Sequence, residues 1–183
     1  MSTKNRKGST KMITLIALHL IASSVTASPV PESCAGRAVD RDAIAALTTI
    51  EEELGVPRER RGILAAVWCV ESAWSPSAEP LYGDRGRALG PLQFHLPLWR
   101  MCGLHDDARI YLLGSARCWL YHVERLIPKA LALCGPKRAF DVAEAMVSAP
   151  ARYGWRCRAA SKHVRLLTTW QKQASKVVVV DVD

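Results

Sequence analysis

Residues 63–74, Ile-Leu-Ala-Ala-Val-Trp-Cys-Val-Glu-Ser-Ala-Trp, are the stretch that decides the fold. From Ile63 to Val70 the stretch contains no polar residue. A helix that is apolar on every side is buried, because other elements must cover all of its faces. Pro57 suits a first helical turn. We therefore predict a buried helix over residues 58–73, wrapped by the rest of the domain.

Helical signals continue on both sides of this segment. Asp40 or Asp42 can cap a helix that runs to Leu54. Pro and Gly are dense between residues 75 and 90, which indicates a loop with at most a short hairpin and no long strand. Further helices are expected at 96–101, from 108 to 134 with interruptions near Gly114 and Pro128, at 138–148 and at 161–173. The sequence thus predicts a mostly α protein, α+β at most.

The first 27 residues have the order of a secretory signal. Four cations and no acid precede an apolar stretch from Met12 to Ile21, and the small residue Ala27 closes a cleavage site. About ten apolar residues are too few to span a bilayer, so no stable membrane insertion is predicted. We expect cleavage near Ala27 and a secreted or periplasmic protein. Residues 28–38 then form an extended lead-in, 39–174 a single domain and 175–183 a tail.

The net charge weakens once this signal is removed. Lys and Arg number 25 against 17 Asp and Glu, and taking the four cations of residues 1–27 from the net charge of +8 leaves +4. No basic run or basic–aromatic alternation remains, so no nucleic-acid partner is predicted. The absence of a basic amphipathic helix also argues against a membrane-active protein. We expect a monomer.

Six cysteines lie beyond the signal, and an even number in an exported chain predicts three disulfides. They are Cys34, Cys69, Cys102, Cys118, Cys134 and Cys157. The closest pairs are 16 residues apart, unlike the short spacing of zinc sites, so no metal and no cofactor is predicted. Six cysteines allow 15 pairings, which the sequence leaves open. A Cys118–Cys134 bridge requires a helix break, such as one at Pro128, because a continuous helix separates the two by about 24 Å.

Glu71 is the strongest candidate for chemistry. It follows eight apolar residues, at the end of the most buried predicted helix. Val70, Trp68 and Trp74 should partly desolvate its carboxyl group, which raises a carboxyl pKa and keeps the group protonated near neutral pH. A protonated carboxyl can donate to the leaving oxygen of a glycosidic bond. The alternative is a helix-terminal Glu that turns toward water.

The loop after this helix adds a second set of polar groups. Asp84 supplies another carboxylate, and Gly86 and Gly90 allow the backbone to approach a ligand closely. Gln93 has both a donor and an acceptor for sugar hydroxyls. Most of the six Trp are expected in the core, while any exposed ring could stack on a sugar face.

Over residues 60–100 the chain resembles the lysozyme-like superfamily of soluble lytic transglycosylases and goose-type lysozymes. Transglycosylases have a Glu-Ser at the end of a buried helix, then Pro, Ala and a Gly-rich segment ending in Gln, matched here by Glu71-Ser72, Pro76, Ala78, Gly86, Gly90 and Gln93. The goose-type loop is matched by Gly83-Asp84-Arg85-Gly86, with Asp84 thirteen residues after Glu71.

The resemblance implies a lysozyme-like catalytic domain over residues 39–174 that binds peptidoglycan strands. It implies cleavage of the β-1,4 bond between N-acetylmuramic acid and N-acetylglucosamine, with Glu71 as general acid/base. It also implies that Ser72, Gly90 and Gln93 line the sugar cleft. With no second carboxylate in reach, the 6-hydroxyl of the substrate can attack and give a 1,6-anhydro product. If Asp84 activates water, hydrolysis becomes the alternative, which requires roughly 6.5–9.5 Å between carboxyl groups.

Two departures from the family pattern concern the support of Glu71. His95 stands where goose-type enzymes carry a further Asp. Val147 and Ser148 replace the Tyr and Asn of a later transglycosylase helix, and Tyr153 in the following loop is a candidate substitute. Ser148 and Tyr153 are therefore predicted to contact substrate. The departures also support an alternative, a glycan-binding protein that kept the fold and lost the chemistry.

Overall fold

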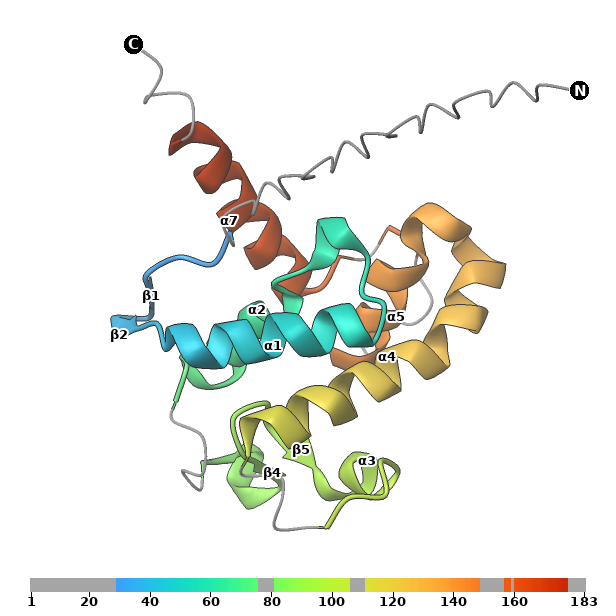
Figure 1. The fold of residues 1–183 in the computed structure, drawn as a ribbon. Coiled ribbons are helices and arrows are strands. Elements are labelled where there is room, and N and C mark those ends of the chain that lie inside the picture. Colours follow the sequence, from blue (N-terminus) through green and yellow to red (C-terminus); the bar gives the residue numbers. More distant parts are fainter. Residues whose placement is uncertain (1–28, 76–80, 106–110, 149–156, 159, 178–183) are drawn as a thin grey trace, which may run out of the picture.

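The computed structural model describes residues 29–75, 81–105, 111–148, 157–158 and 160–177 (Figure 1). Its main helices are α1 (Arg41–Glu53), α2 (Ile63–Ser72), α3 (Leu96–Arg100), α4 (Leu112–Cys134), α5 (Ala139–Ser148) and α7 (Lys162–Val177). Short 3-10 turns occur at Arg58–Arg60, Asp84–Gly86 and Pro136–Arg138. The prediction of a mostly α protein is confirmed. The signal expected at residues 1–27 lies outside the described residues.

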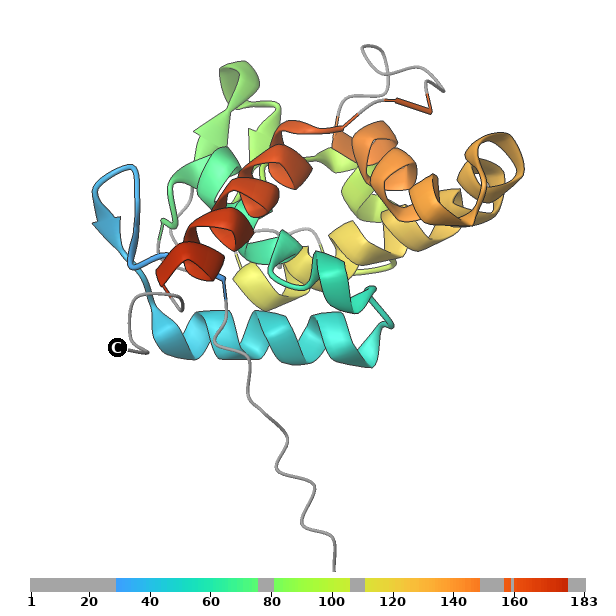
Figure 2. The ribbon, with the colours of Figure 1, turned by 90° about the horizontal axis from the view of Figure 1, so that it is seen from above.

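Helix α2 is the buried centre of this arrangement. All six residues from Ile63 to Trp68 have exposed fractions of 2% or less. Helices α1 and α7 both pack against α2, and Figures 1 and 2 show α7 crossing the molecule on the side opposite α4. The first turn of α1 is capped by Asp40, whose Oδ1 accepts a hydrogen bond from the Ala43 N–H at 3.0 Å. Helix α1 was predicted from this cap, and helix α2 from its apolar sequence.

The start of α2 differs from the prediction. The helix begins at Ile63 rather than residue 58, because Arg61 is extended and Gly62 has a left-handed φ of 93°. The side chain of Glu51, in α1, supplies the hydrogen-bond acceptors that a preceding helical turn would have provided. Its two carboxylate oxygens accept hydrogen bonds from the backbone N–H groups of Gly62 at 2.6 Å and Leu64 at 2.7 Å. A carboxylate from a different helix therefore caps the buried helix.

Glu51 should make stability depend on pH. Burial raises the pKa of this side chain from the ordinary 4.5 of the unfolded chain to about 7. The two backbone hydrogen bonds lower the pKa, but their effect is smaller than that of burial. A carboxyl whose folded-state pKa is raised stabilises the fold fully below pH 4.5, and this contribution is lost as pH rises to about 7. We expect Glu51→Gln to remove that part of the pH dependence, measured as the free energy of unfolding by denaturant between pH 4.5 and 7.5.

Glu52→Gln is the matched control for this measurement. Glu52 is the neighbouring residue, half exposed and paired with Arg61 at 2.6 Å, so losing its charge should have little effect on stability. Identical pH dependence of unfolding in the wild type and in Glu51→Gln would rule out the role assigned to Glu51.

Helix α4 is continuous, so the expected interruptions at Gly114 and Pro128 are wrong. Pro128 lacks an N–H and removes one hydrogen bond inside the helix, which bends a helix without necessarily ending it. Figure 1 shows the helix axis turning where the colour passes from yellow to orange. Helix α4 ends at Cys134, as predicted from the Gly135-Pro136 signal that follows. Helix α7 extends to Val177, into the region expected to be a tail.

The strands are two residues long throughout the described chain, in agreement with the prediction of no long strand. Strands β1 (Ser33–Cys34) and β2 (Arg37–Ala38) pair in the segment expected to be an extended lead-in. A three-stranded antiparallel sheet has the order β3-β4-β5, formed by Tyr82–Gly83, Ala88–Leu89 and Phe94–His95. This sheet and α3 form the green lobe beside the first turns of α4 in Figure 1.

Three disulfides join the six cysteines, which confirms that prediction. The pairs are Cys34–Cys69, Cys102–Cys118 and Cys134–Cys157. Because α4 is continuous, Cys118 and Cys134 lie at distant points of one helix and each bonds a different segment. This number of disulfides fits an extracellular or periplasmic protein. Over the described ranges, the helices are all too short or too polar to cross a membrane.

Candidate functional site

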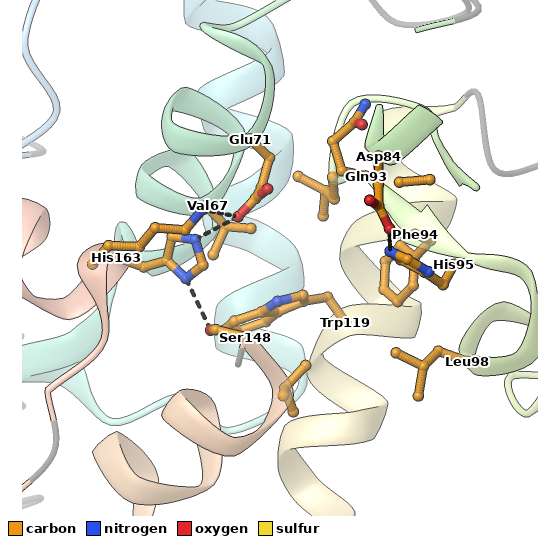
Figure 3. A pocket seen from close by; sticks show the side chains of 14 residues that line it. Val67, Glu71, Asp84, Gln93, Phe94, His95, Leu98, Trp119, Ser148 and His163 are labelled. Carbon is orange, nitrogen blue, oxygen red and sulfur yellow. Dashed lines mark hydrogen bonds and ion pairs between the residues drawn. The ribbon is translucent and has the colours of Figure 1, made fainter. Parts of the chain in front are cut away.

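A pocket of about 340 Å³ lies between the helices and the three-stranded sheet (Figure 3). Its helical wall combines the end of α2 with residues of α4, α5 and α7, and its opposite wall comes from the sheet and α3. The helical wall is made of Val67, Glu71, Trp119, Val147, Ser148, Lys162 and His163, and the opposite wall of Asp84, Ala88, Leu92, Gln93, Phe94, His95 and Leu98. The pocket therefore collects groups that are far apart in the sequence.

Glu71 lies at the mouth of this pocket because α2 ends immediately after it. Ala73 and Trp74 have left-handed φ angles of 49° and 54°, which stop the helix and turn the chain. The indole of Trp74 donates to the Ala65 carbonyl at 2.9 Å and so holds the turn against α2. The side chain of Glu71 is 21% exposed, which contradicts the alternative that this Glu, at the end of its helix, simply turns toward water.

The partners of Glu71 overturn the expected direction of its pKa shift. Burial alone raises the pKa of Glu71, as predicted from its apolar neighbours. The Lys162 Nζ, however, donates to Glu71 Oε1 at 2.8 Å, and His163 Nε2 lies 2.9 Å from the same oxygen. These hydrogen bonds and positive charges together hold the pKa of Glu71 below its usual value. The carboxyl is therefore ionised at neutral pH in this arrangement.

A second buried carboxylate lies behind His163. The side chains of His163 and Glu144 are 1% and 0% exposed, and His163 Nδ1 lies 2.7 Å from Glu144 Oε1. The Ser148 hydroxyl donates to the same Glu144 oxygen at 2.6 Å. Burial lowers the pKa of His163, but its hydrogen bonds to Glu144 and Glu71 outweigh this effect and raise it. The imidazole thus bridges two carboxylates of different helices.

This cluster contains Ser, His and Glu, yet it lacks the geometry of a serine hydrolase. In such a triad the Ser faces one ring nitrogen of the His and the acid faces the other. Here Ser148 Oγ lies 3.1 Å from His163 Nδ1, the same nitrogen that faces Glu144, whereas Nε2 faces Glu71. Ser148 therefore cannot be activated as a nucleophile in this arrangement.

Asp84 lies on the opposite wall of the pocket, across from Glu71 (Figure 3). Its backbone is left-handed, with φ of 46°. Its carboxylate accepts from Arg87 Nη2 at 3.0 Å and lies 3.4 Å from His95 Nε2. The second carboxylate predicted from the sequence thus lines the same pocket, and its oxygens already contact the basic side chains of Arg87 and His95.

Gln93 lines the pocket and also holds the loop that carries Asp84. Its Nε2 donates to the carbonyl oxygens of Gly90 at 2.7 Å and Leu81 at 3.3 Å. A Cβ at Gly83 would lie 1.9 Å from Gln93 Oε1, so a larger residue there would displace the Gln93 side chain. The amide donors expected to bind sugar hydroxyls are therefore engaged with the loop backbone.

Of the other residues predicted to contact substrate, some line the pocket and others do not. Ser148 lines the pocket, whereas Ser72 and Gly90 do not: the Ser72 hydroxyl donates to the Trp68 carbonyl at 3.2 Å, and the Gly90 N–H donates to the Leu81 carbonyl. The predictions for Tyr153, Pro76 and Ala78 lie outside the described residues. The five described Trp are all buried, so none offers an exposed ring for stacking, and among them Trp119 lines the pocket.

Sequence reasoning missed Lys162, His163 and Glu144. One available signal was the position of Glu144 in the middle of the apolar segment 139–148, the same feature that drew attention to Glu71. Its spacing of four residues from Ser148 places both on one helix face. No comparable signal marks His163, which is 92 residues from Glu71.

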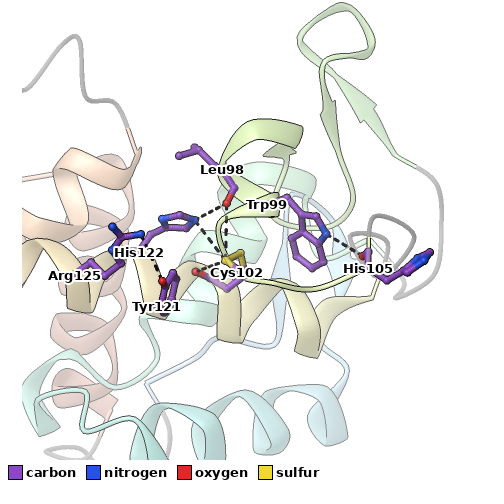
Figure 4. The surroundings of a disulfide bond; sticks show 8 residues. Leu98, Trp99, Cys102, His105, Tyr121, His122 and Arg125 are labelled. Atoms are coloured by element: carbon purple, nitrogen blue, oxygen red, sulfur yellow. Dashed lines mark hydrogen bonds between the residues drawn. A yellow bond between two sulfur atoms is a disulfide. The ribbon is translucent and has the colours of Figure 1, made fainter.

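Cys102, Cys118 and His122 form a second cluster, whose members do not line the pocket (Figure 4). Their potential ligand atoms lie within 4.8 Å of one another. The two sulfur atoms are joined in a disulfide and cannot act as thiolates, and His122 Nε2 lies 2.8 Å from the Leu98 carbonyl oxygen. Burial lowers the pKa of His122, against the effect of this backbone hydrogen bond. The cluster therefore stabilises the junction of α3 and α4.

Comparison with protein-family models, with curated proteins and with solved structures finds no match for this chain.

Proposed function

We propose that the protein is an exported enzyme that cleaves the β-1,4 bond between N-acetylmuramic acid and N-acetylglucosamine in peptidoglycan. Glu71 is the general acid/base in this proposal. The observation that carries it is the position of the Glu71 carboxyl, at the end of the buried helix α2 and open to a pocket with a second carboxylate on its far wall. A carboxyl group held at a cleft can act as the general acid of glycosidic cleavage.

The apolar lining supports a saccharide ligand. Leu98, which is 39% exposed, offers apolar surface to the face of a sugar ring, while Gln93, His95 and Ser148 add polar groups at the edges. Sugar binding also excludes water from Glu71. Desolvation favours the neutral form of a carboxyl, so a bound strand should raise the pKa of Glu71 toward the value that an acid catalyst needs.

The contacts of the Asp84 carboxylate with Arg87 and His95 favour the lytic transglycosylase reaction over hydrolysis. A general base must accept a proton from water, and the Asp84 carboxylate already accepts a hydrogen bond from Arg87 and faces His95. In the transglycosylase reaction the 6-hydroxyl of the muramic acid residue attacks its own C1. Asp84 then shapes the sugar site without entering the chemistry.

Product analysis tests the proposal. Digestion of purified peptidoglycan sacculi should release soluble fragments with 1,6-anhydro ends, each one water lighter in mass spectrometry than the hydrolysis product. Asp84→Asn should keep the rate within a few-fold and leave the products unchanged. Reducing ends, together with a loss of roughly 10²-fold or more in Asp84→Asn, would instead establish the goose-type hydrolytic alternative. Failure of the wild type to release any fragment would refute the enzyme proposal.

A second candidate is a glycan-binding protein of the same fold that has lost its chemistry. The ion pairs of Glu71 with Lys162 and His163 favour it, because an ionised carboxylate accepts hydrogen bonds but cannot donate a proton. This candidate predicts saturable binding of peptidoglycan fragments with no turnover on long incubation. Calorimetry combined with mass spectrometry of the recovered ligand separates it from the enzyme.

A further inference from the structure

We propose that His163 and Glu144 form a proton relay behind Glu71, in which His163 stores the proton that Glu71 delivers to the leaving group. This inference rests on the proposed role of Glu71 as general acid/base, and it assigns a function to two buried residues that this role alone leaves unused. His163 and Glu144 are positioning residues in this scheme, since they act through Glu71 rather than on the substrate.

The hydrogen-bond geometry suits a doubly protonated ring. His163 Nε2 lies 2.9 Å from Glu71 Oε1, and Nδ1 lies 2.7 Å from Glu144 Oε1. A neutral imidazole has one N–H and could donate to only one of these oxygens, leaving a lone pair against the other. An imidazolium donates to both. Figure 3 shows the ring of His163 between Glu71 and the end of α5 at Ser148.

The surroundings of His163 carry charges of the opposite sign. His163 faces Glu71 from α2, Glu144 and Ser148 from α5, and the edge of the Trp119 ring from α4, while Lys162 precedes it in α7. Two carboxylates thus match the imidazolium and the Lys162 ammonium. Buried charges persist only when they are paired in this way. The two carboxylates raise the pKa of His163 in spite of its burial, which favours the protonated ring.

The relay resolves the conflict between an ionised Glu71 and an acid catalyst. As the bond between C1 and the glycosidic oxygen breaks, that oxygen keeps the electron pair and takes a proton from Glu71, which receives the Nε2 proton of His163. His163 is then neutral, with Nδ1–H still donated to Glu144. When the 6-hydroxyl or a water forms the new bond to C1, its proton passes to Glu71 and back to Nε2. One proton has moved from nucleophile to leaving group.

Lys162 is the other cation on Glu71, and it is a poor substitute for this role. Its side chain is half exposed, and an alkylammonium group is a much weaker acid than an imidazolium, so it gives up a proton to a carboxylate far less readily. Imidazole has a pKa much closer to the working pH and can both give and accept the proton. Lys162 therefore stabilises ionised Glu71 but does not supply its proton.

Glu144→Gln tests the relay with little change in shape. We expect side-chain ¹⁵N NMR of histidine, with His163→Gln to identify the signals, to find His163 protonated at pH 7 in the wild type. In Glu144→Gln its titration should move to lower pH. The same variant should lose on the order of 10² in kcat with little change in KM, and the alkaline limb of its pH–rate profile should shift by the same amount as the NMR midpoint. Glu53→Gln, which removes the charge of a half-exposed residue of α1 paired with Arg117, should leave kcat and the pH profile unchanged.

Two outcomes would overturn the relay in an active enzyme. The first is a neutral His163 in the wild type at pH 7, and the second is full kcat with an unchanged pH profile in His163→Gln. A wild type with no activity but with His163 protonated would instead overturn the proposed function, since the NMR result does not depend on turnover. Activity that falls in Glu144→Gln without any shift of the His163 titration would assign Glu144 a structural role alone.

Discussion

Glu71→Gln is expected to reduce the release of peptidoglycan fragments by about 10²–10⁴-fold. Gln has nearly the same shape and can still accept a hydrogen bond from Lys162, but it can neither give nor take a proton. Because the substrate contacts on both walls of the pocket remain, binding of peptidoglycan fragments should persist. The measurement is the rate of soluble fragment release from sacculi, with binding followed separately by calorimetry.

Glu53→Gln is the control for this substitution. It removes the same charge from a half-exposed residue of α1 that pairs with Arg117 at 2.7 Å, away from the pocket. Circular dichroism should establish that both variants remain folded. Fragment release by Glu71→Gln at the wild-type rate would exclude Glu71 as the acid/base and with it the proposed reaction.

Reduction of the three disulfides is expected to unfold the protein. The bonds close loops of 35, 16 and 23 residues. By the chain-entropy relation each contributes roughly 3–4 kcal/mol. The total of about 10 kcal/mol is comparable to the whole free energy of unfolding of a typical domain, roughly 5–15 kcal/mol. Far-UV circular dichroism before and after reduction, with thiol titration to count the opened bonds, measures the effect.

The three disulfides should differ in how much each one stabilises the protein. Cys34–Cys69 closes the longest loop and ties the N-terminal segment to α2, two residues before Glu71. Replacing both residues by Ala should lower the melting temperature more than replacing Cys102 and Cys118, whose loop is the shortest. An unchanged melting temperature after all six thiols have become titratable would contradict this account of stability.

The local elements of the fold could be predicted from short segments of sequence. The Asp40 cap and the apolar spacing that follows predicted α1, the run from Ile63 predicted the buried α2, and Gly135-Pro136 predicted the end of α4. These signals work because capping and helix periodicity involve residues within about four positions of one another. The same reasoning failed at Gly114 and Pro128, where packing of α4 against α5 and α1 sustains the helix through unfavourable residues.

In the candidate site, too, local features could be predicted from the sequence, whereas features that depend on tertiary contacts could not. Glu71, Asp84 and Gln93 were found from the sequence because they belong to one segment around a buried helix end and a Gly-rich loop, and all three line the pocket. The protonation state of Glu71 was predicted in the wrong direction. The sequence neighbours of Glu71 account only for its desolvation, whereas the two cations that reverse the shift come from α7.

The sequence by itself determined that the segment from Ile63 to Trp68 is buried, that a carboxyl follows it at the end of the same helix, and that six cysteines form disulfides. The tertiary structure alone decided which cysteines pair, where α2 begins, and which charges surround Glu71. Glu51, Glu144 and His163 are matched to partners 11 to 92 residues away. Such pairs depend on how helices pack, because a buried charge is stable only beside a partner that the fold brings to it.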